Sequence, residues 1–319
     1  MPEARLTRYL VTPPFANQRL DQGLAALTGL SRRKVKELLP QGLVWLNGKP
    51  CRVAARPLRL GDVLDLLWSG PGLQPPPALP PPLPIVFEDG WFVVIDKPGG
   101  MLSQPAPQQR VGELSALEHL CLQLSFREGH RMELLLVHRL DRVASGLLLF
   151  AKHHDAAGAL SRQFASTEVE KRYVAVVTGT PPSHMRINAP IAPDPLVAGR
   201  FHIAKQGRKA LTYVRLLAQG REAALVEVQP ITGRTHQIRV HLASIGCPIA
   251  GDSLYGSPLP APRPMLHAAG LTFSHPKSGQ TLQLNAPLPP ELVAFCSNHG
   301  VPFPVKERLI PAPLSSCGS

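Results

Sequence analysis

The pattern of apolar and polar residues before residues 70–84 differs from the pattern after them. After this segment, runs rich in apolar and β-branched residues are separated by turn residues, which predicts strands. These strands fall within residues 85–97, 134–137, 147–152, 171–179, 212–217 and 224–229. Apolar residues at helical spacing predict helices over 156–164 and 237–245. The mixture favours an α+β fold with a mainly antiparallel sheet and helices on its flanks.

The region before residue 70 has a shorter and more basic pattern. An amphipathic helix is predicted over 19–25, and a second helix over 32–39 is capped by Ser31. A strand over 42–49 ends in the turn dipeptide Asn47-Gly48, and a last strand covers 60–66. We therefore predict a small α/β domain in front of the larger one.

The segment between the two regions is low in complexity. Eight of the fourteen residues from Pro71 to Pro84 are proline, which fixes φ and removes backbone donors. Such a segment is typical of an exposed, polyproline-like spacer with few contacts. The predicted organisation is a small domain at 17–69, a linker at 70–84, a large domain at 85–295 and a C-terminal tail at 296–319.

Charge points to a polyanionic partner. The 319 residues include 34 Lys and Arg against 22 Asp and Glu, a formal net charge of +12. Residues 1–72 hold eleven of the cations and five of the acids, so half of the excess lies in less than a quarter of the chain. A protein this basic is expected to bind nucleic acid or an acidic membrane, and no apolar run approaches the ~20 residues that span a bilayer. Nucleic acid is therefore the favoured partner.

Five scattered cysteines suggest a reducing compartment. They form no C-x-x-C pair and are odd in number, which argues against a disulfide framework or a zinc site. The first residues lead into no signal-peptide core. We expect a cytoplasmic protein that works as a monomer, with no metal, cofactor or membrane.

The densest candidate chemistry lies in two stretches, 138–146 (HRLDRVASG) and 232–241 (TGRTHQIRVH). Asp141 stands at the edge of apolar runs, where a carboxylate is costly unless it is paired. A carboxylate held ionised by arginine in a partly buried pocket is a candidate nucleophile or base. The alternative is a turn-capping Asp in a structural ion pair. The pairing arginine could be any of Arg139, Arg142, Arg234 and Arg239.

The small domain resembles the S-four-type RNA-binding domain. The resemblance rests on R-L-D at 19–21, S-R-R with a later leucine from Ser31, G-x-V-x-x-N-G-K at 42–49 and G-D at 61–62. It implies that the cations of the second helix contact RNA phosphates; these are Arg32, Arg33, Lys34 and Lys36. Without the rest of the pattern, a merely solvated helix face would be the better interpretation.

The large domain resembles an RluA-type pseudouridine synthase from residue 85 to about 292. The matching blocks occur in order along the chain: E-D at 88–89 with K-P-x-G-M at 97–101, H-R-L-D at 138–141 with S-G-L-L at 145–148, K-x-Y at 171–173, G-R-T-H-Q-I-R-V-H at 233–241, G-D-x-x-Y-G at 251–256, and L-H-A at 266–268 with F-x-H-P at 273–276. The family isomerises uridine in RNA without redox chemistry or a metal.

The resemblance assigns roles to particular residues. It makes Asp141 the catalytic carboxylate, acting on the sugar or on the base, and Arg239 its partner. Tyr173 would stack on the flipped uracil and could serve in proton transfer at carbon 5, and Leu266 would be an apolar wall. Arg139 would reach RNA, with an ion pair to Asp141 as the rival role. His138 and His236 are expected to orient their loops.

The chain departs from the family pattern at two positions. Ala144 stands where threonine is usual, and Gln104 where histidine is common. Losing one hydroxyl beside Asp141 removes one hydrogen bond, worth about 1 kcal/mol, and should modulate activity.

Two other classes of function fit the sequence less well. A catalytically idle RNA-binding or ribosome-assembly factor would not need Asp141, Tyr173 and Arg239 together. A metal-dependent hydrolase lacks an H-E-x-x-H motif or a paired-carboxylate cluster. A linked S-four-type domain resembles the family members that act on large-subunit ribosomal RNA; the resemblance implies that substrate, with transfer RNA as the alternative.

Overall fold

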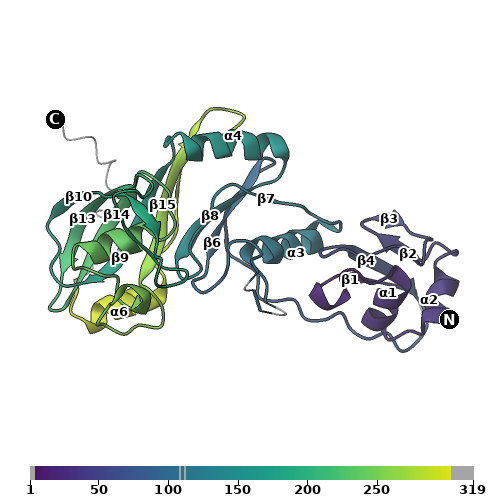
Figure 1. Cartoon of the computed structure of the whole chain (residues 1–319). Helices are drawn as coiled ribbons and strands as arrows, with labels where there is room; N and C mark the ends of the chain where they lie inside the picture. Colours follow the sequence, from purple (N-terminus) through teal and green to yellow (C-terminus); the bar gives the residue numbers. More distant parts are fainter. Residues whose placement is uncertain (1–3, 108, 111–112, 303–319) are drawn as a thin grey trace. The chain divides into compact units, whose positions relative to one another are not determined.

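The computed structural model describes residues 4–107, 109–110 and 113–302, and its elements are labelled in Figure 1. Contacts between Cα atoms divide the chain into two units. The first unit comprises Met1–Pro84, Leu102–Leu136 and Phe150–His154, and the second comprises Ile85–Met101, Val137–Leu149 and Asp155–Ser319.

The first unit is built on a four-stranded antiparallel sheet in the order β1-β4-β2-β3. Helices α1 and α2 bury their apolar faces in the same core, and α3 and the short strand β7 complete the unit. The elements are β1 (Arg5–Leu10), α1 (Leu20–Thr28), α2 (Arg32–Leu38), β2 (Val44–Leu46), β3 (Lys49–Pro50), β4 (Val63–Trp68), α3 (Ala116–Glu128) and β7 (Leu135–Leu136).

The local signals in the N-terminal sequence act as expected. The Ser31 side chain accepts a hydrogen bond from the Lys34 amide at 3.2 Å, which caps α2. Asn47 and Gly48 both have positive φ, 52° and 74°, as a tight hairpin turn between β2 and β3 requires. The predicted helices and hairpin of the small domain are therefore confirmed.

Strand β1 was not predicted, and it extends the small domain before residue 17. It pairs antiparallel with β4 over its six residues. In that register Arg8 lies opposite Asp65, and the two form an ion pair of 2.8 Å. Such a cross-strand pair stabilises the pairing of β1 with β4. The apolar pattern alone did not reveal this pairing.

The proline-rich segment has more contacts than a free spacer would have. The Tyr9 hydroxyl donates to the carbonyl of Gln74, whose amide donates to Thr28. At the far end, the amide of Leu83 donates to the side chain of Gln123 on α3, which donates back to the Leu83 carbonyl. These hydrogen bonds join the proline-rich segment to the first unit near both of its ends, while most of its residues are exposed.

Helix α3 belongs with the small domain. Leu122 of α3 packs in one buried cluster with Leu10 and Val63. Just beyond the helix, the amide of Arg131 donates to Asn47, and its guanidinium donates to the Leu60 carbonyl. Part of the sequence predicted as the large domain therefore folds against the small one.

The second unit is built on a large mixed sheet. Its strands run in the order β10-β13-β14-β9-β15-β8-β6-β5, with β16 on β15. Strand β8 pairs in parallel with β15, whereas the neighbours from β10 to β15, the pair β15–β16 and the pair β5–β6 are antiparallel. This confirms the predicted mainly antiparallel α+β fold. The strands are β5 (Ile85–Glu88), β6 (Phe92–Lys97), β8 (Ser145–Ala151), β9 (Glu170–Thr178), β10 (His184–Asn188), β13 (Leu211–Gln219), β14 (Ala223–Pro230), β15 (Leu266–Ser274) and β16 (Thr281–Asn285).

Helices and one small hairpin complete this unit. The core between the sheet and α5 and α6 contains Ile238, Leu242, Leu292 and Phe295. The predicted tail begins at residue 296, which lies inside α6; residues 303–319 of that tail are outside the described residues. The remaining elements are α4 (His154–Ala165), β11 (Ile191–Pro193), β12 (Phe201–Ile203), α5 (Gln237–Ser244) and α6 (Pro290–Asn298).

The parallel pair β8–β15 depends on one glycine. Gly146 lies opposite Ala268 and has φ of +112°. A Cβ at this position would lie 2.3 Å from the Ala268 carbonyl oxygen. Only glycine fits such a position, so Gly146 sets the distance between the two strands that border the candidate site.

Candidate active site

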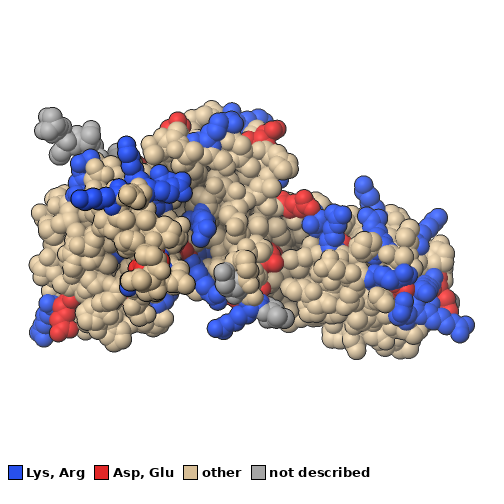
Figure 2. All heavy atoms as spheres, in the orientation of Figure 1, with Lys and Arg blue, Asp and Glu red and all other residues tan. Residues whose placement is uncertain are grey.

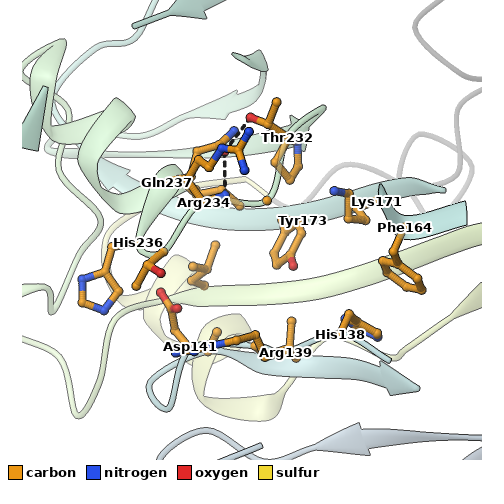
Figure 3. Close-up of a pocket in the computed structure, with 17 residues that line it drawn as sticks. His138, Arg139, Asp141, Phe164, Lys171, Tyr173, Thr232, Arg234, His236 and Gln237 are labelled. Atoms are coloured by element: carbon orange, nitrogen blue, oxygen red, sulfur yellow. Dashed lines mark hydrogen bonds between the residues drawn. The ribbon is translucent and has the colours of Figure 1, made fainter. Parts of the chain in front are cut away.

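The two motif-rich stretches meet at one pocket in the second unit. Its volume is about 260 Å³, and it opens beside Asp141 and Tyr173 (Figure 3). Its lining comes from the loop that leads into β8, from α4, β9 and β15, and from the turn before α5. The lining residues are His138, Arg139, Leu140, Asp141, Ala144, Phe164, Lys171, Tyr173, Pro230, Thr232, Gly233, Arg234, Thr235, His236, Gln237, Ile238 and Leu266.

Asp141 lies near Arg239, but Arg239 has a closer partner. Arg239 donates from Nε and Nη2 to the two carboxylate oxygens of Asp252, at 2.7 and 2.8 Å. Its Nη1 lies 3.8 Å from Asp141 Oδ2, beyond hydrogen-bond distance. Asp252 is 1% exposed and Asp141 is 19% exposed. The expected pairing is thus present only as a longer ion pair, because Asp252 takes the two-point contact.

This arrangement leaves the Asp141 carboxylate accessible beside a cation. A bidentate contact fixes the guanidinium of Arg239, whose side chain is 5% exposed. Its remaining positive field still acts on Asp141 across 3.8 Å. No arginine among the described residues occupies the Asp141 oxygens at hydrogen-bond distance, so they remain free to meet a substrate.

His236 forms a fixed wall next to Asp141. It directly precedes α5 and has left-handed backbone, with φ of 56°. The Nδ1 atom lies 2.9 Å from the Tyr255 hydroxyl, which also accepts the Phe201 amide. Burial lowers the pKa of His236, so the ring is a neutral hydrogen-bonding wall at neutral pH. Its expected orienting role is consistent with this geometry.

The turn that carries His236 is held by Gln237. Its side-chain oxygen accepts from the Arg234 amide and the Thr232 hydroxyl, the two hydrogen bonds drawn in Figure 3. Its amide nitrogen donates to Leu211 and Thr212 of β13. These contacts tie the T-G-R-T-H stretch to the sheet.

Tyr173 projects from β9 into the middle of the pocket (Figure 3). Burial raises the pKa of its hydroxyl, and the negative charge of Asp141 raises it further, so the phenol is protonated at neutral pH. Leu266, 3% exposed at the start of β15, and Ala144, 2% exposed, add apolar wall. An aromatic face with apolar neighbours suits a planar base.

The opposite end of the pocket holds a stacked pair. The rings of His138 and Phe164 lie 4.3 Å apart at an angle of 13°. The Leu149 amide donates to Nε2 of His138 at 3.0 Å, and burial lowers the pKa of this histidine to about 3. His138 is therefore neutral and anchors the loop to β8, in keeping with its expected role.

Arg139 lines the pocket and is exposed. Within the described part of the chain it forms no ion pair with Asp141, so the rival role for this arginine is not present. Its guanidinium is left available for a ligand.

Two buried cations support the loop that carries Asp141. Lys97 is fully buried and donates to the carbonyls of Pro98, Met101 and Arg142 at 2.8, 2.9 and 3.5 Å. Burial lowers its pKa to about 7, to which the charge of Arg263 also contributes. Through Lys97, the block K-P-x-G-M at 97–101 thus holds the loop that carries Asp141.

Arg263 is the second support, and no pattern in the sequence singled it out. It donates to the carbonyls of Val143 and Leu266, at 3.3 and 3.2 Å, and to Ser145 Oγ at 2.9 Å. It also forms an ion pair of 2.7 Å with Glu291. One side chain therefore joins the loop after Asp141 to the start of β15.

The predicted RNA-binding cations lie together on α2, in the other unit, but they are paired. Arg32 donates to Asp21 at 3.0 Å and Lys36 lies 3.8 Å from it, while Arg33 and Lys34 each lie 3.3 Å from Glu37. Figure 2 accordingly shows blue and red side chains intermixed at the N-terminal module. Of the four cations, Arg33 has the most exposed side chain, at 92%.

The described residues offer no metal site. Among them, no group of three or more His, Cys, Asp or Glu side chains is placed to hold a metal ion. The four cysteines that the structure describes are free thiols. No described helix has both the length and the apolar composition to cross a bilayer.

Known proteins match both units. A model of RNA pseudouridylate synthases matches residues 91–244, and a model of the S4 domain matches residues 18–64. An uncharacterized RNA pseudouridine synthase of Chloroflexus aurantiacus is 42% identical over 302 residues, which cover 89% of this chain and 91% of the relative. Ribosomal large subunit pseudouridine synthase D of Zymomonas mobilis is 35% identical over 309 residues, covering 92% and 96%.

A solved structure agrees with this relationship. Human RNA Pseudouridylate Synthase Domain Containing 4 is 28% identical and covers 70% of this chain and 95% of its own, with a TM-score of 0.58. The similarity to this structure indicates the same family as the similarity to the two relatives. The chain therefore belongs to the RluA-type RNA pseudouridine synthases, isomerases that convert uridine in RNA to pseudouridine, and it carries an S4 domain near its N-terminus.

Proposed function

We propose that this enzyme modifies uridine in large-subunit ribosomal RNA, and that Asp141 is its catalytic carboxylate. The observation that carries the second part is the accessible Asp141 carboxylate in a pocket of about 260 Å³ beside an aromatic face. The first part is supported by relatives named as large-subunit synthases, such as that of Zymomonas mobilis. A ribosomal substrate would place the enzyme in the cytoplasm.

The reaction needs the target base outside its stack. Uracil that has flipped into the pocket would lie against Tyr173, with Leu266 as the apolar wall. The bond between ribose carbon 1′ and N1 breaks, the base rotates, and a bond forms from carbon 5 to carbon 1′. Carbon 5 loses a proton and N1 gains one, so the reaction is balanced without an oxidant or reductant.

The residues divide this work between them. Asp141 starts the cleavage, because no described residue lies within hydrogen-bond distance of its side-chain oxygens. Arg239, held by Asp252, acts on Asp141 with its positive charge across 3.8 Å. The raised pKa of Tyr173 favours the stacking role over that of a proton acceptor. Arg139 is available for RNA at the mouth of the pocket.

Carbodiimide mapping of pseudouridine in total cellular RNA tests the substrate. We expect one or more signals in large-subunit ribosomal RNA to vanish when the gene is deleted and to return with the wild-type gene, but not with Asp141→Asn. Loss of signals only in transfer RNA would overturn the ribosomal assignment. Return of the signals with Asp141→Asn would overturn the role of Asp141.

A further inference from the structure

Lys171 is a cation in the pocket that has no partner among the described residues. It projects from β9 at the end of the pocket away from Asp141 (Figure 3). Within the described chain, no residue forms a hydrogen bond or ion pair with its ammonium group. Burial lowers the pKa of this lysine, so keeping it charged costs the folded protein free energy.

Lys97, a buried lysine of the same unit, shows what a structural ammonium looks like. Its Nζ donates to three backbone carbonyls and holds two loops together. Lys171 lacks such contacts to the described residues and faces the cavity instead. A partly buried ammonium without a hydrogen-bond or ion-pair partner among the described residues suits an anionic group that arrives with the substrate.

The position of Lys171 suggests which group that is. Residues two apart on a strand project on the same face, about 7 Å from each other, so Lys171 and Tyr173 both face the pocket. If uracil stacks on Tyr173, the ammonium group of Lys171 lies beside the base, at about the 7 Å that separates these two side chains. Burial and the nearby charge of Lys171 lower the pKa of His138, so the ring stacked on Phe164 is neutral and Lys171 supplies positive charge at this end of the pocket.

We propose that Lys171 binds the backbone phosphate next to the target uridine and thereby positions the flipped nucleotide. This rests on the proposed function only in so far as the enzyme flips a uridine; it does not depend on which RNA supplies it.

Lys171→Met is the first test, on short single-stranded model RNA with the full-length enzyme. Charge-assisted hydrogen bonds of this kind are worth about tenfold to hundredfold, so kcat/KM should fall by that factor. The log–log salt slope of RNA binding should flatten by about 0.7, the value for one phosphate neutralised on a single strand. Lys277→Met, on the exposed turn between β15 and β16 outside the pocket lining, is the control and should change neither.

Stability separates a binding role from a structural one. Because Lys171 has no partner among the described residues of the free protein, Lys171→Met should melt at the same temperature as wild type or higher. A lower Tm would show that the ammonium is structural and would overturn the proposal.

A neutral methylphosphonate at each phosphate flanking the target uridine identifies the contact. Wild type should lose about tenfold to hundredfold in kcat/KM at one of the two positions, while Lys171→Met should lose nothing more there. Equal losses in both enzymes, or none in wild type, would overturn the proposal, the latter pointing to a uracil carbonyl. A wild-type enzyme active on model RNA but idle on ribosomal RNA would count against the ribosomal substrate and leave this comparison intact.

Discussion

Two aspartates of this chain, Asp21 and Asp141, meet arginine in opposite ways. Asp21 in α1 is fully buried, and Arg19 and Arg32 each donate to it at 3.0 Å. Burial alone would raise the pKa of Asp21, but these hydrogen bonds outweigh it and lower the pKa to about 2. Asp141 is partly exposed, and its arginine stays 3.8 Å away.

The difference lies in what is left for a ligand. The lone pairs of Asp21 are used within the protein, so the residue stabilises its module and orients the cations around it. Asp141 receives the field of a cation whose hydrogen bonds belong to Asp252. A carboxylate can thus lie in the field of a cation while its lone pairs remain available, as a reactive group requires.

Replacing Asp141 should have the largest effect. Asp141→Asn removes the charge but keeps the shape, so pseudouridine formation should be abolished while RNA affinity stays within a few fold. Tritium release from RNA labelled at uracil carbon 5 measures it. Substantial release from a verified Asn variant would remove Asp141 from the mechanism.

Arg239→Met should have the next largest effect. It removes the field on Asp141 and most of the turnover, and it also leaves Asp252 buried without its partner, which costs about 3–5 kcal/mol. The double variant Arg239→Met/Asp252→Asn relieves this second cost. We expect the double variant to regain thermal stability but not turnover; recovery of turnover would mean that Arg239 acts only as a structural partner of Asp252.

Asp21→Asn should lower stability without touching the chemistry. Loss of its charged hydrogen bonds costs about 1.5–3 kcal/mol. Since the folded pKa is about 2 and the usual value is 3.8, the stabilisation is complete above about pH 4 and is lost as the pH falls toward 2. Hydrogen exchange of the α1 amides at pH 6 and pH 3 should show a difference between variant and wild type that narrows at the lower pH. A difference that is the same at both pH values would contradict the ion-pair account.

The smallest change is expected from the cations of α2. Replacing Arg32, Arg33, Lys34 and Lys36 by Ala should weaken RNA binding and flatten its salt dependence, by about 0.7–0.9 in log–log slope for each phosphate that is no longer neutralised. Asp21 and Glu37 offset part of this charge, so we expect the slope to change by less than four phosphates would give. Arg33→Ala alone serves as the reference, because that side chain is the most exposed of the four. An unchanged affinity and slope in the fourfold variant would assign α2 a role other than RNA binding.

Local patterns in the sequence predicted much of the fold. The cap at Ser31, the Asn47-Gly48 turn and the hairpin of β5 and β6 depend on neighbours along the chain, which a sequence displays directly. Helix α3 was missed because its leucines at 117, 120, 122 and 124 mix spacings of two and three. Its partners lie more than fifty residues away, in β1 and β4.

Only part of the candidate site could be predicted from the sequence. The motifs brought Asp141, Tyr173 and Leu266 to one pocket, as expected. They did not tell which carboxylate takes the two-point contact of Arg239, because that depends on the path of the chain between α5 and Asp252. The matched block G-D-x-x-Y-G at 251–256 was the available signal, since it supplies both Asp252 and Tyr255.

Gly146 has a consequence for the genetics of this enzyme. Every missense change at its codon adds a Cβ, which would lie 2.3 Å from a backbone oxygen, and backbone cannot swing aside as the end of a flexible side chain can. Selection at this codon should therefore be indifferent to the kind of amino acid introduced and reject all alike, whereas at Ala144 it should depend on size and polarity. In a saturation-mutagenesis library, all variants at position 146 should then be depleted to a similar extent. At position 144, depletion should vary with the residue introduced.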